Sequence, residues 1–184
     1  SLIIFLMAIT TSAQEEHMKF MGISFNENIK TFISLLEDKG FTYFQDIDNT
    51  QIMKGKFAGY TDCTLFIYPT INSQIRAVAV DFPRTKQWSV LYGNYTHIKD
   101  MLSQKYGSPA SCEEEFESII TPQNDRDKMH EVEMERCKYS TVYLTNTGSI
   151  SVKITSVEMI CSVSLLYSDT INMKINESSA IDDL

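Results

Sequence analysis

The chain has 184 residues, of which 43% are hydrophobic and 22% are charged, with seven glycines and four prolines. This composition is typical of a globular protein with a buried core, and it excludes a low-complexity or collagen-like chain. Sixteen basic residues against 24 acidic residues give a net charge of −8, which argues against nucleic acid as a partner because phosphate backbones attract basic proteins.

Residues 1–13 differ in character from the rest of the chain. Leu2–Ile9 is an unbroken apolar run, and the small residues Thr11–Ala13 precede Gln14. The run is too short to span a bilayer, which takes about 20 apolar residues, but this pattern is typical of the remnant of a signal peptide. A buried N-terminal strand is the alternative. We therefore expect a periplasmic or secreted protein that begins at Gln14 and has no membrane span.

Residues 14–86 predict a helix followed by strands. Apolar residues recur at helical spacing over Ile29–Leu36, and Gly40 ends the pattern. A capping box over Ser24–Glu27, with Asn26 as a competing N-cap, would begin this helix. Strand-like runs follow at Phe41–Ile47, Gln51–Gly59, Asp62–Tyr68 and Gln74–Phe82, separated by turn-forming residues.

Residues 87–170 predict the same order a second time. Gly107 and Pro109 end a second helix, and an acidic insertion at Glu113–Glu135 carries a short helix from about Asn124. The second helix has one apolar stripe, made of Trp88, Leu91, Tyr95, Ile98 and Leu102. Strand-like runs follow at Ser140–Thr145, Ile150–Thr155 and Met159–Tyr167. Residues 171–184 are expected to form a polar C-terminal tail.

The expected fold class is α+β, with two tandem units that each consist of a helix and an antiparallel meander. Consecutive strands joined by short turns favour antiparallel pairing, and one helix for each sheet covers only one face of it. The other face of each sheet would then be open for binding.

Several segments also carry a resemblance to a known group of proteins. They are GISFNENIKTFISLLEDKGF, GKFAGY, VAVDFP, Trp88 and NYTHIKDMLSQKYGSP. This frame, from Gly22 to Tyr167, resembles uncharacterised secreted proteins of gut Bacteroidetes, and its plan is similar to the beta-lactamase-inhibitor-protein-like architecture. The resemblance implies a fold and an exported location, and it carries no functional residues because one architecture serves many functions.

The four cysteines are even in number, and an exported chain would lie in an oxidising compartment where pairing is common. Cys112 and Cys137 flank the acidic insertion, so we expect them to form a disulfide that closes this loop. Cys63 and Cys161 lie within strand-like runs. They are expected in the core, either bonded to each other or as buried thiols.

Catalytic and metal-binding patterns are weak, and the sequence indicates no enzyme, no cofactor and no metal. The histidines, His17, His97 and His130, are scattered. The segment from His130 to Cys137 does not bring three good ligands onto one face of either a helix or a strand. The acidic run is interpreted as a solvated surface.

Aromatic residues make up 11% of the chain, and tyrosine is enriched at recognition surfaces. A possible binding face would include Tyr43, Tyr60, Tyr68 and Tyr143. The leading hypothesis is an exported, non-enzymatic module that binds an unknown protein or envelope component through an open sheet face. The alternative is a small-molecule carrier or a hydrolase with a pocket between helices and sheet.

Overall fold

The computed structural model describes residues 16–119 and 121–182, which form an α+β fold. Within these residues there are four helices, one antiparallel sheet of eight strands and one of two strands. The expected signal-peptide remnant and the expected start at Gln14 lie outside the described residues.

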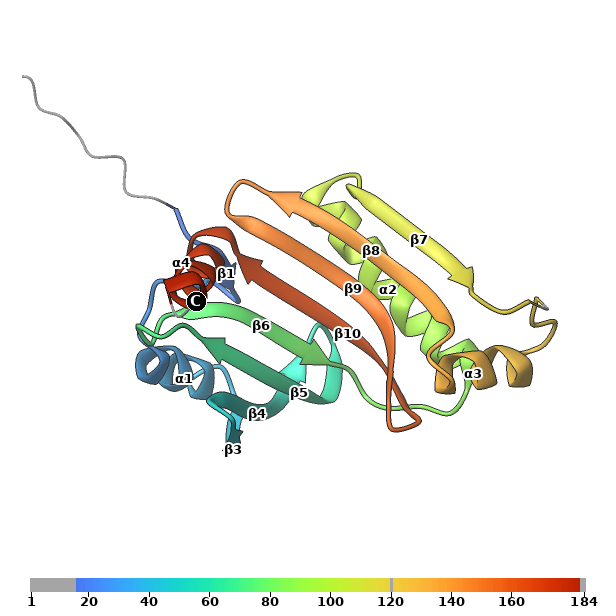
Figure 1. The fold of residues 1–184 in the computed structure, drawn as a ribbon. Coiled ribbons are helices and arrows are strands. Elements are labelled where there is room, and N and C mark those ends of the chain that lie inside the picture. The colour runs from blue at the N-terminus through green and yellow to red at the C-terminus, as the bar shows by residue number, and fades with distance from the viewer. Residues whose placement is uncertain (1–15, 120, 183–184) are drawn as a thin grey trace, which may run out of the picture.

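Figure 1 shows the order of the elements along the chain. They are β1 (Lys19–Phe20), β2 (Ile23–Ser24), α1 (Ile29–Glu37), β3 (Thr42–Ile47), β4 (Thr50–Phe57), β5 (Tyr60–Pro69), β6 (Ile75–Asp81), α2 (Trp88–Tyr106), β7 (Ser111–Phe116), α3 (Asp125–Glu133), β8 (Cys137–Thr145), β9 (Gly148–Val157), β10 (Ile160–Asp169) and α4 (Thr170–Asp182). The expected strands of both halves, and α2 with its stop at Gly107, are confirmed within a few residues at each end.

The eight strands form one continuous sheet in the order β3-β4-β5-β6-β10-β9-β8-β7. The two meanders expected from the sequence are therefore joined, because β6 pairs antiparallel with β10 from Ala77 and Ser168 to Asp81 and Ser164. Separate sheets would leave these two buried, apolar strands as edges, which favour aggregation. Pairing them places both at the centre of the sheet.

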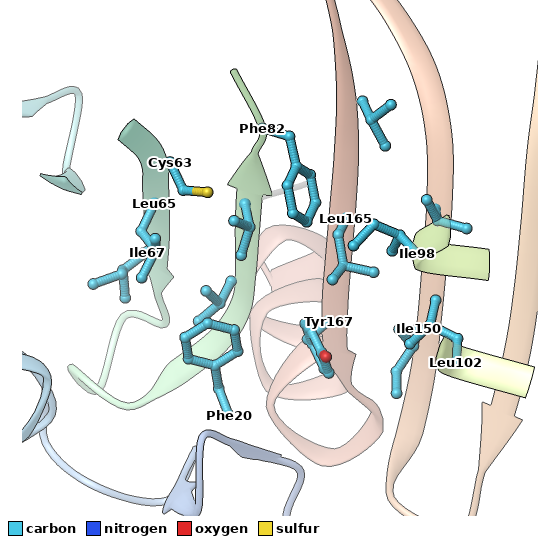
Figure 2. Packing of buried hydrophobic residues seen from close by; sticks show 14 of the residues in the cluster. Phe20, Cys63, Leu65, Ile67, Phe82, Ile98, Leu102, Ile150, Leu165 and Tyr167 are labelled. Carbon is cyan, nitrogen blue, oxygen red and sulfur yellow. The ribbon is translucent and has the colours of Figure 1, made fainter. Parts of the chain in front are cut away.

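One face of the sheet, here called the helix face, packs against the helices. A single row of residues in register crosses five strands, and all of its members are buried: Met53, Leu65, Val80, Leu165 and Val152. Ile98 and Leu102 of α2 cover this face together with the rest of the expected stripe, which is buried throughout (Figure 2). The apolar stripe thus has the core role that its helical spacing predicts.

On the opposite face, here called the polar face, every residue of the adjacent row is polar or charged. Because successive side chains on a strand point to opposite sides, each neighbour of a buried core residue lies on this face. The row consists of Thr42, Lys54, Thr64, Asp81, Ser164, Lys153, Ser140 and Glu113. Along this part of the sheet, one side is therefore apolar and the other is polar.

Helix starts and one strand differ in part from the expectation. The N-cap of α1 is Asn28, whose side chain accepts a hydrogen bond from the amide of Lys30, because Ser24 belongs to β2 and Asn26 accepts a hydrogen bond from Gln74. α3 follows its N-cap Asn124 as predicted. The start of the acidic insertion instead forms β7, which pairs with β8 at the edge of the sheet.

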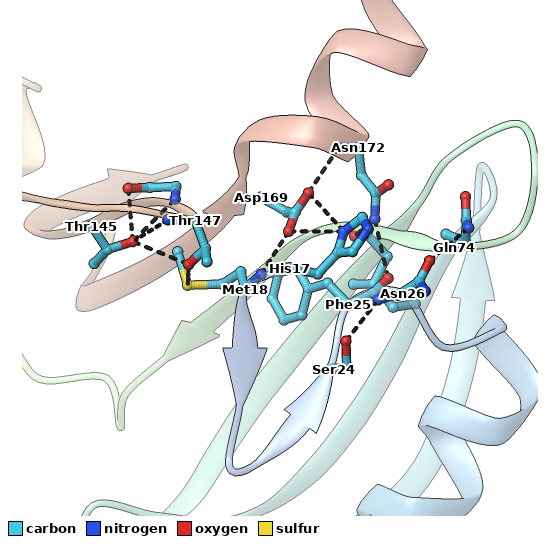
Figure 3. Close-up of polar contacts among 12 residues, drawn as sticks. His17, Met18, Ser24, Phe25, Asn26, Gln74, Thr145, Thr147, Asp169 and Asn172 are labelled. Carbon is cyan, nitrogen blue, oxygen red and sulfur yellow. Dashed lines mark hydrogen bonds and ion pairs between the residues drawn. The ribbon is translucent and has the colours of Figure 1, made fainter. Parts of the chain in front are cut away.

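The segment expected to be a polar tail forms helix α4 instead. Buried Asn172 donates hydrogen bonds to the carbonyls of Phe25 and Ile75, and the buried carboxylate of Asp169 accepts them from the amides of Met18 and Asn172 (Figure 3). These contacts join three distant parts of the chain, which local sequence patterns do not reveal. No helix among the described residues is long and apolar enough to cross a membrane.

Candidate functional site

The four tyrosines expected to form a binding face do not lie together. Tyr143 is only 1% exposed and donates a hydrogen bond to the carbonyl of Lys99 at 2.9 Å, so it belongs to the contact between β8 and α2. Tyr60 packs edge-on against Phe82, with 5.0 Å between the ring centroids. Both rings therefore pack within the structure, with Tyr143 buried and Tyr60 partly buried.

Tyr43 and Tyr68 lie on opposite faces of the sheet. Tyr43 is 42% exposed, and its register with buried Met53 places it on the side of the helix face. Tyr68 lies in register with Ala77 on the polar face, with the guanidinium of Arg76 5.4 Å from its ring centroid. Because strand side chains alternate, strand membership alone does not place aromatic residues on one face.

The expected disulfide between Cys112 and Cys137 is wrong for this structure, in which all four cysteines are free. Cys112 pairs in register with Thr141, and Cys137 pairs with Phe116. The two cysteines are thus displaced by four positions along the ladder, roughly 13 Å at 3.3 Å per residue. A disulfide needs Cα atoms within about 7 Å.

Cys63 and Cys161 lie in the core as expected, and they are buried thiols rather than a bonded pair. Burial raises the pKa of Cys63 to about 11, against a smaller lowering by a hydrogen bond with the backbone of Phe57. Burial likewise raises the pKa of Cys137 to about 12. A thiol is nucleophilic as the thiolate, so these cysteines are poorly suited to nucleophilic chemistry.

A chain of hydrogen bonds runs from α2 to the edge strand β7. The phenol of Tyr95 lies 2.6 Å from the hydroxyl of Thr141, which in turn lies 3.3 Å from the sulfur of Cys112. The thiol of Cys112 lies 3.6 Å from a carboxylate oxygen of Glu114, which also forms an ion pair with Lys99. Either hydroxyl can be the donor between Tyr95 and Thr141, and Tyr95 also forms a hydrogen bond with Glu114.

This polar chain holds α2 against the sheet and offers little for catalysis. Burial alone would raise the pKa of Glu114, but the hydrogen bond and charge of Lys99 outweigh it and lower the pKa below its ordinary value. A general base works best with a pKa near the operating pH. Glu114 is therefore a weak base toward the neighbouring thiol of Cys112.

The most exposed apolar side chains of the sheet edge lie on β3. We call Thr42, Phe44, Ile47 and Lys54 the β3 surface. Phe44 is 53% exposed and Ile47 is 51% exposed. The ammonium nitrogen of Lys54 lies 4.0 Å from the centroid of the Phe44 ring, because a β-bulge within β3 shifts the register there. Apolar side chains exposed at a sheet edge favour contact with another chain.

A hollow of about 880 Å³ adjoins the β3 surface at its Thr42 end. Its lining includes four basic residues, Lys39, Lys54, Lys56 and Arg84, and two acidic residues, Asp62 and Asp81. The lining thus has a formal charge of +2 (four minus two) in a chain whose net charge is −8. Burial raises the pKa of Asp81, and its hydrogen bond with Ser164 opposes this shift. This basic hollow favours an anionic group.

A larger hollow of about 1220 Å³ lies at the first turns of α2 and α3. Its charged lining consists of Lys86, Arg126, Asp125, Asp127, Glu131 and Glu133, together with His130. Two basic residues against four acidic ones give it the same sign as the whole chain. Glu131 is already engaged by Arg136, with 2.8 Å between Nε and Oε2. Within the described residues, no three His, Cys, Asp or Glu side chains lie close enough to hold a metal ion.

Comparisons with known proteins add no further guide to this site. No protein-family model matches the chain, and no curated protein and no solved structure is significantly similar to it. The function must therefore be argued from the surfaces described above.

Proposed function

We propose that this protein is an exported, non-enzymatic module that binds another protein or an envelope component through the polar face of its sheet, at the β3 surface. The observation that carries the proposal is the exposure of Phe44 and Ile47 at 53% and 51% on an edge strand. Large apolar side chains at such an edge favour unwanted pairing with other chains, which proteins normally prevent. A partner that covers the edge gives these side chains a role.

The opposite edge of the sheet supports the proposal by contrast. β7 carries three consecutive glutamates, Glu113–Glu115, and charged side chains are a common protection of sheet edges. β3 carries one charged residue, Asp46. The two edge strands of the same sheet thus differ in charge, and β3 is the one suited to contact with another chain.

We also propose that residues 14–86 and 87–170 are tandem units of one plan. Support comes from the order of the elements, since α1 precedes β3–β6 and α2 precedes β7–β10. The strand order is likewise mirrored about the pairing of β6 with β10. In two such units, β3 and β7 occupy equivalent edge positions, and β3 is the one that carries an apolar surface.

Site-specific photocrosslinking tests the proposed binding surface. A photoreactive residue at Phe44 should give one discrete crosslinked product in an extract of the source compartment. The matched control replaces Leu144, which is 68% exposed on β8 and should give none. Equal crosslinking from both positions, or no product from Phe44, would refute the proposed surface. The location is tested separately by the intact mass of the exported protein, which should correspond to a start at Gln14.

A further inference from the structure

We propose that the partner adds an extended, acidic segment to the outer edge of β3 as a further antiparallel strand. This inference rests on the proposed function and names the chemistry of the partner. The backbone of β3 pairs with β4 on one side, and no strand among the described residues lies on its other side. A strand at the edge of a sheet presents unpaired amide and carbonyl groups that can bind an extended chain.

The bulge of β3 sets how such a segment would lie. The register shifts between Tyr43 and Gln45, so regular pairing continues over Gln45–Ile47. Phe44 is displaced toward Lys54, where its exposed ring can cover a side chain of the added strand. A bulge increases the local twist. The site therefore suits a short segment rather than a long strand.

Charge along the edge gives the segment a direction. The Thr42 end lies beside Lys54 and the basic hollow, whereas the Ile47 end carries Asp46 and is followed by Asp48. Acidic residues of the partner are thus favoured at the Thr42 end and disfavoured at the Ile47 end. In antiparallel pairing, the C-terminal half of the added segment lies beside Thr42. We expect apolar residues first and acidic residues at the C-terminal end.

A synthetic peptide of about eight residues is a suitable probe, because it spans β3 at about 3.3 Å per residue. It alternates valine and threonine, ends in two glutamates and is blocked at both ends. On binding, the outward amides of β3 should exchange with solvent at least tenfold more slowly by NMR, while those of β7 stay unchanged. No slowing in β3 at saturating peptide would overturn the inference, as would equal slowing in β7.

Charge variants test the acidic character of the segment. Lys54→Glu should weaken binding of the peptide about tenfold, because it replaces an attraction by a repulsion. Lys105→Glu, at an exposed position of α2 far along the chain from β3, is the matched control and should have no effect. A peptide that ends in lysines instead of glutamates should bind about tenfold more weakly. Equal affinity for both peptides would overturn the acidic assignment.

Two further measurements separate this inference from its alternatives. Methylation of peptide amides on the edge that faces β3 should abolish binding, whereas methylation on the other edge should not; the same effect from both would overturn strand addition. Sedimentation velocity tests a second copy of the chain as the occupant. A concentration-dependent dimer that is lost in Phe44→Asp would overturn the acidic segment as partner. Crosslinking from Phe44 without peptide binding would refute strand addition but leave the proposed function intact.

Discussion

At the scale of single residues, Tyr95 shows how a polar group is used within the core. It is fully buried, and its phenol forms a hydrogen bond with the hydroxyl of Thr141 on β8. Burial raises the pKa of this phenol, so it stays neutral and keeps its proton. A buried donor without a partner would cost about 1 to 3 kcal/mol. The tyrosine in the apolar stripe therefore serves both packing and the hydrogen bonding of β8.

The reactivity of the cysteines is a direct test of the corrected disulfide assignment. Cys112 is exposed, whereas Cys63 and Cys161 are buried and Cys137 is half-buried. We expect an aromatic disulfide reagent at pH 8 to label Cys112 first in the native protein and the other three only after unfolding. Peptide mapping identifies the labelled residues. A native protein in which Cys112 and Cys137 are both unreactive and bonded would contradict the strand register.

The raised thiol pKa values predict a loss of stability in alkaline solution. Below the ordinary pKa of 9.0 both states hold the proton of Cys63, and its contribution is complete. As the pH rises toward about 11, the unfolded chain releases a proton that the folded chain retains, so the free energy of unfolding falls. Urea unfolding at pH 8, 9, 10 and 11 should show this fall. The fall should be shallower in Cys63→Ala, and a curve that stays flat to pH 11 would contradict the prediction.

At the scale of elements, α2 is the best test of the packing against the helix face. Leu102 is 5% exposed within its stripe, so Leu102→Ala should lower the free energy of unfolding by about 2 to 5 kcal/mol through lost burial and a residual cavity. Chemical denaturation measures this change.

The control for this prediction must be a solvent-exposed position of the same helix. Lys99 does not qualify because it is paired with Glu114. Gln104 is exposed, and Gln104→Ala should change the free energy of unfolding by less than about 0.5 kcal/mol. If both variants shift the midpoint equally little, the stripe is not part of the core.

At the scale of the whole molecule, the pairing of β6 with β10 should make the two halves unfold together. One cluster of buried residues includes side chains of both halves, among them Met53 and Val152. Removing either half would expose the central strands of the sheet. Trp88 fluorescence reports on the second half, and far-UV circular dichroism reports on both.

We expect the two signals to give the same midpoint in urea. Coincident transitions by different probes are a standard test of two-state unfolding. Two separated midpoints would instead indicate that residues 14–86 and 87–170 fold independently. Such a result would also remove the physical reason for the continuous sheet.

The sequence by itself determined the elements that depend on local pattern. The stripe of α2, the end of that helix at Gly107 and the N-cap Asn124 of α3 follow from spacing and capping, which act over a few residues. The strand-like runs and the buried positions of Cys63 and Cys161 follow from alternation in the same way.

Only the tertiary structure decided what depends on contacts between distant segments. The register of β7 with β8 separates Cys112 from Cys137. The number of residues between the two cysteines does not determine this register. The bulge of β3 places Phe44 beside Lys54, and one extra residue in a strand changes the face to which the next side chains point. Strict alternation of side chains along the strand therefore does not predict the β3 surface. The pairing of β6 with β10 likewise joins strands that no local pattern relates, because it is set by the burial of apolar edges across the whole fold.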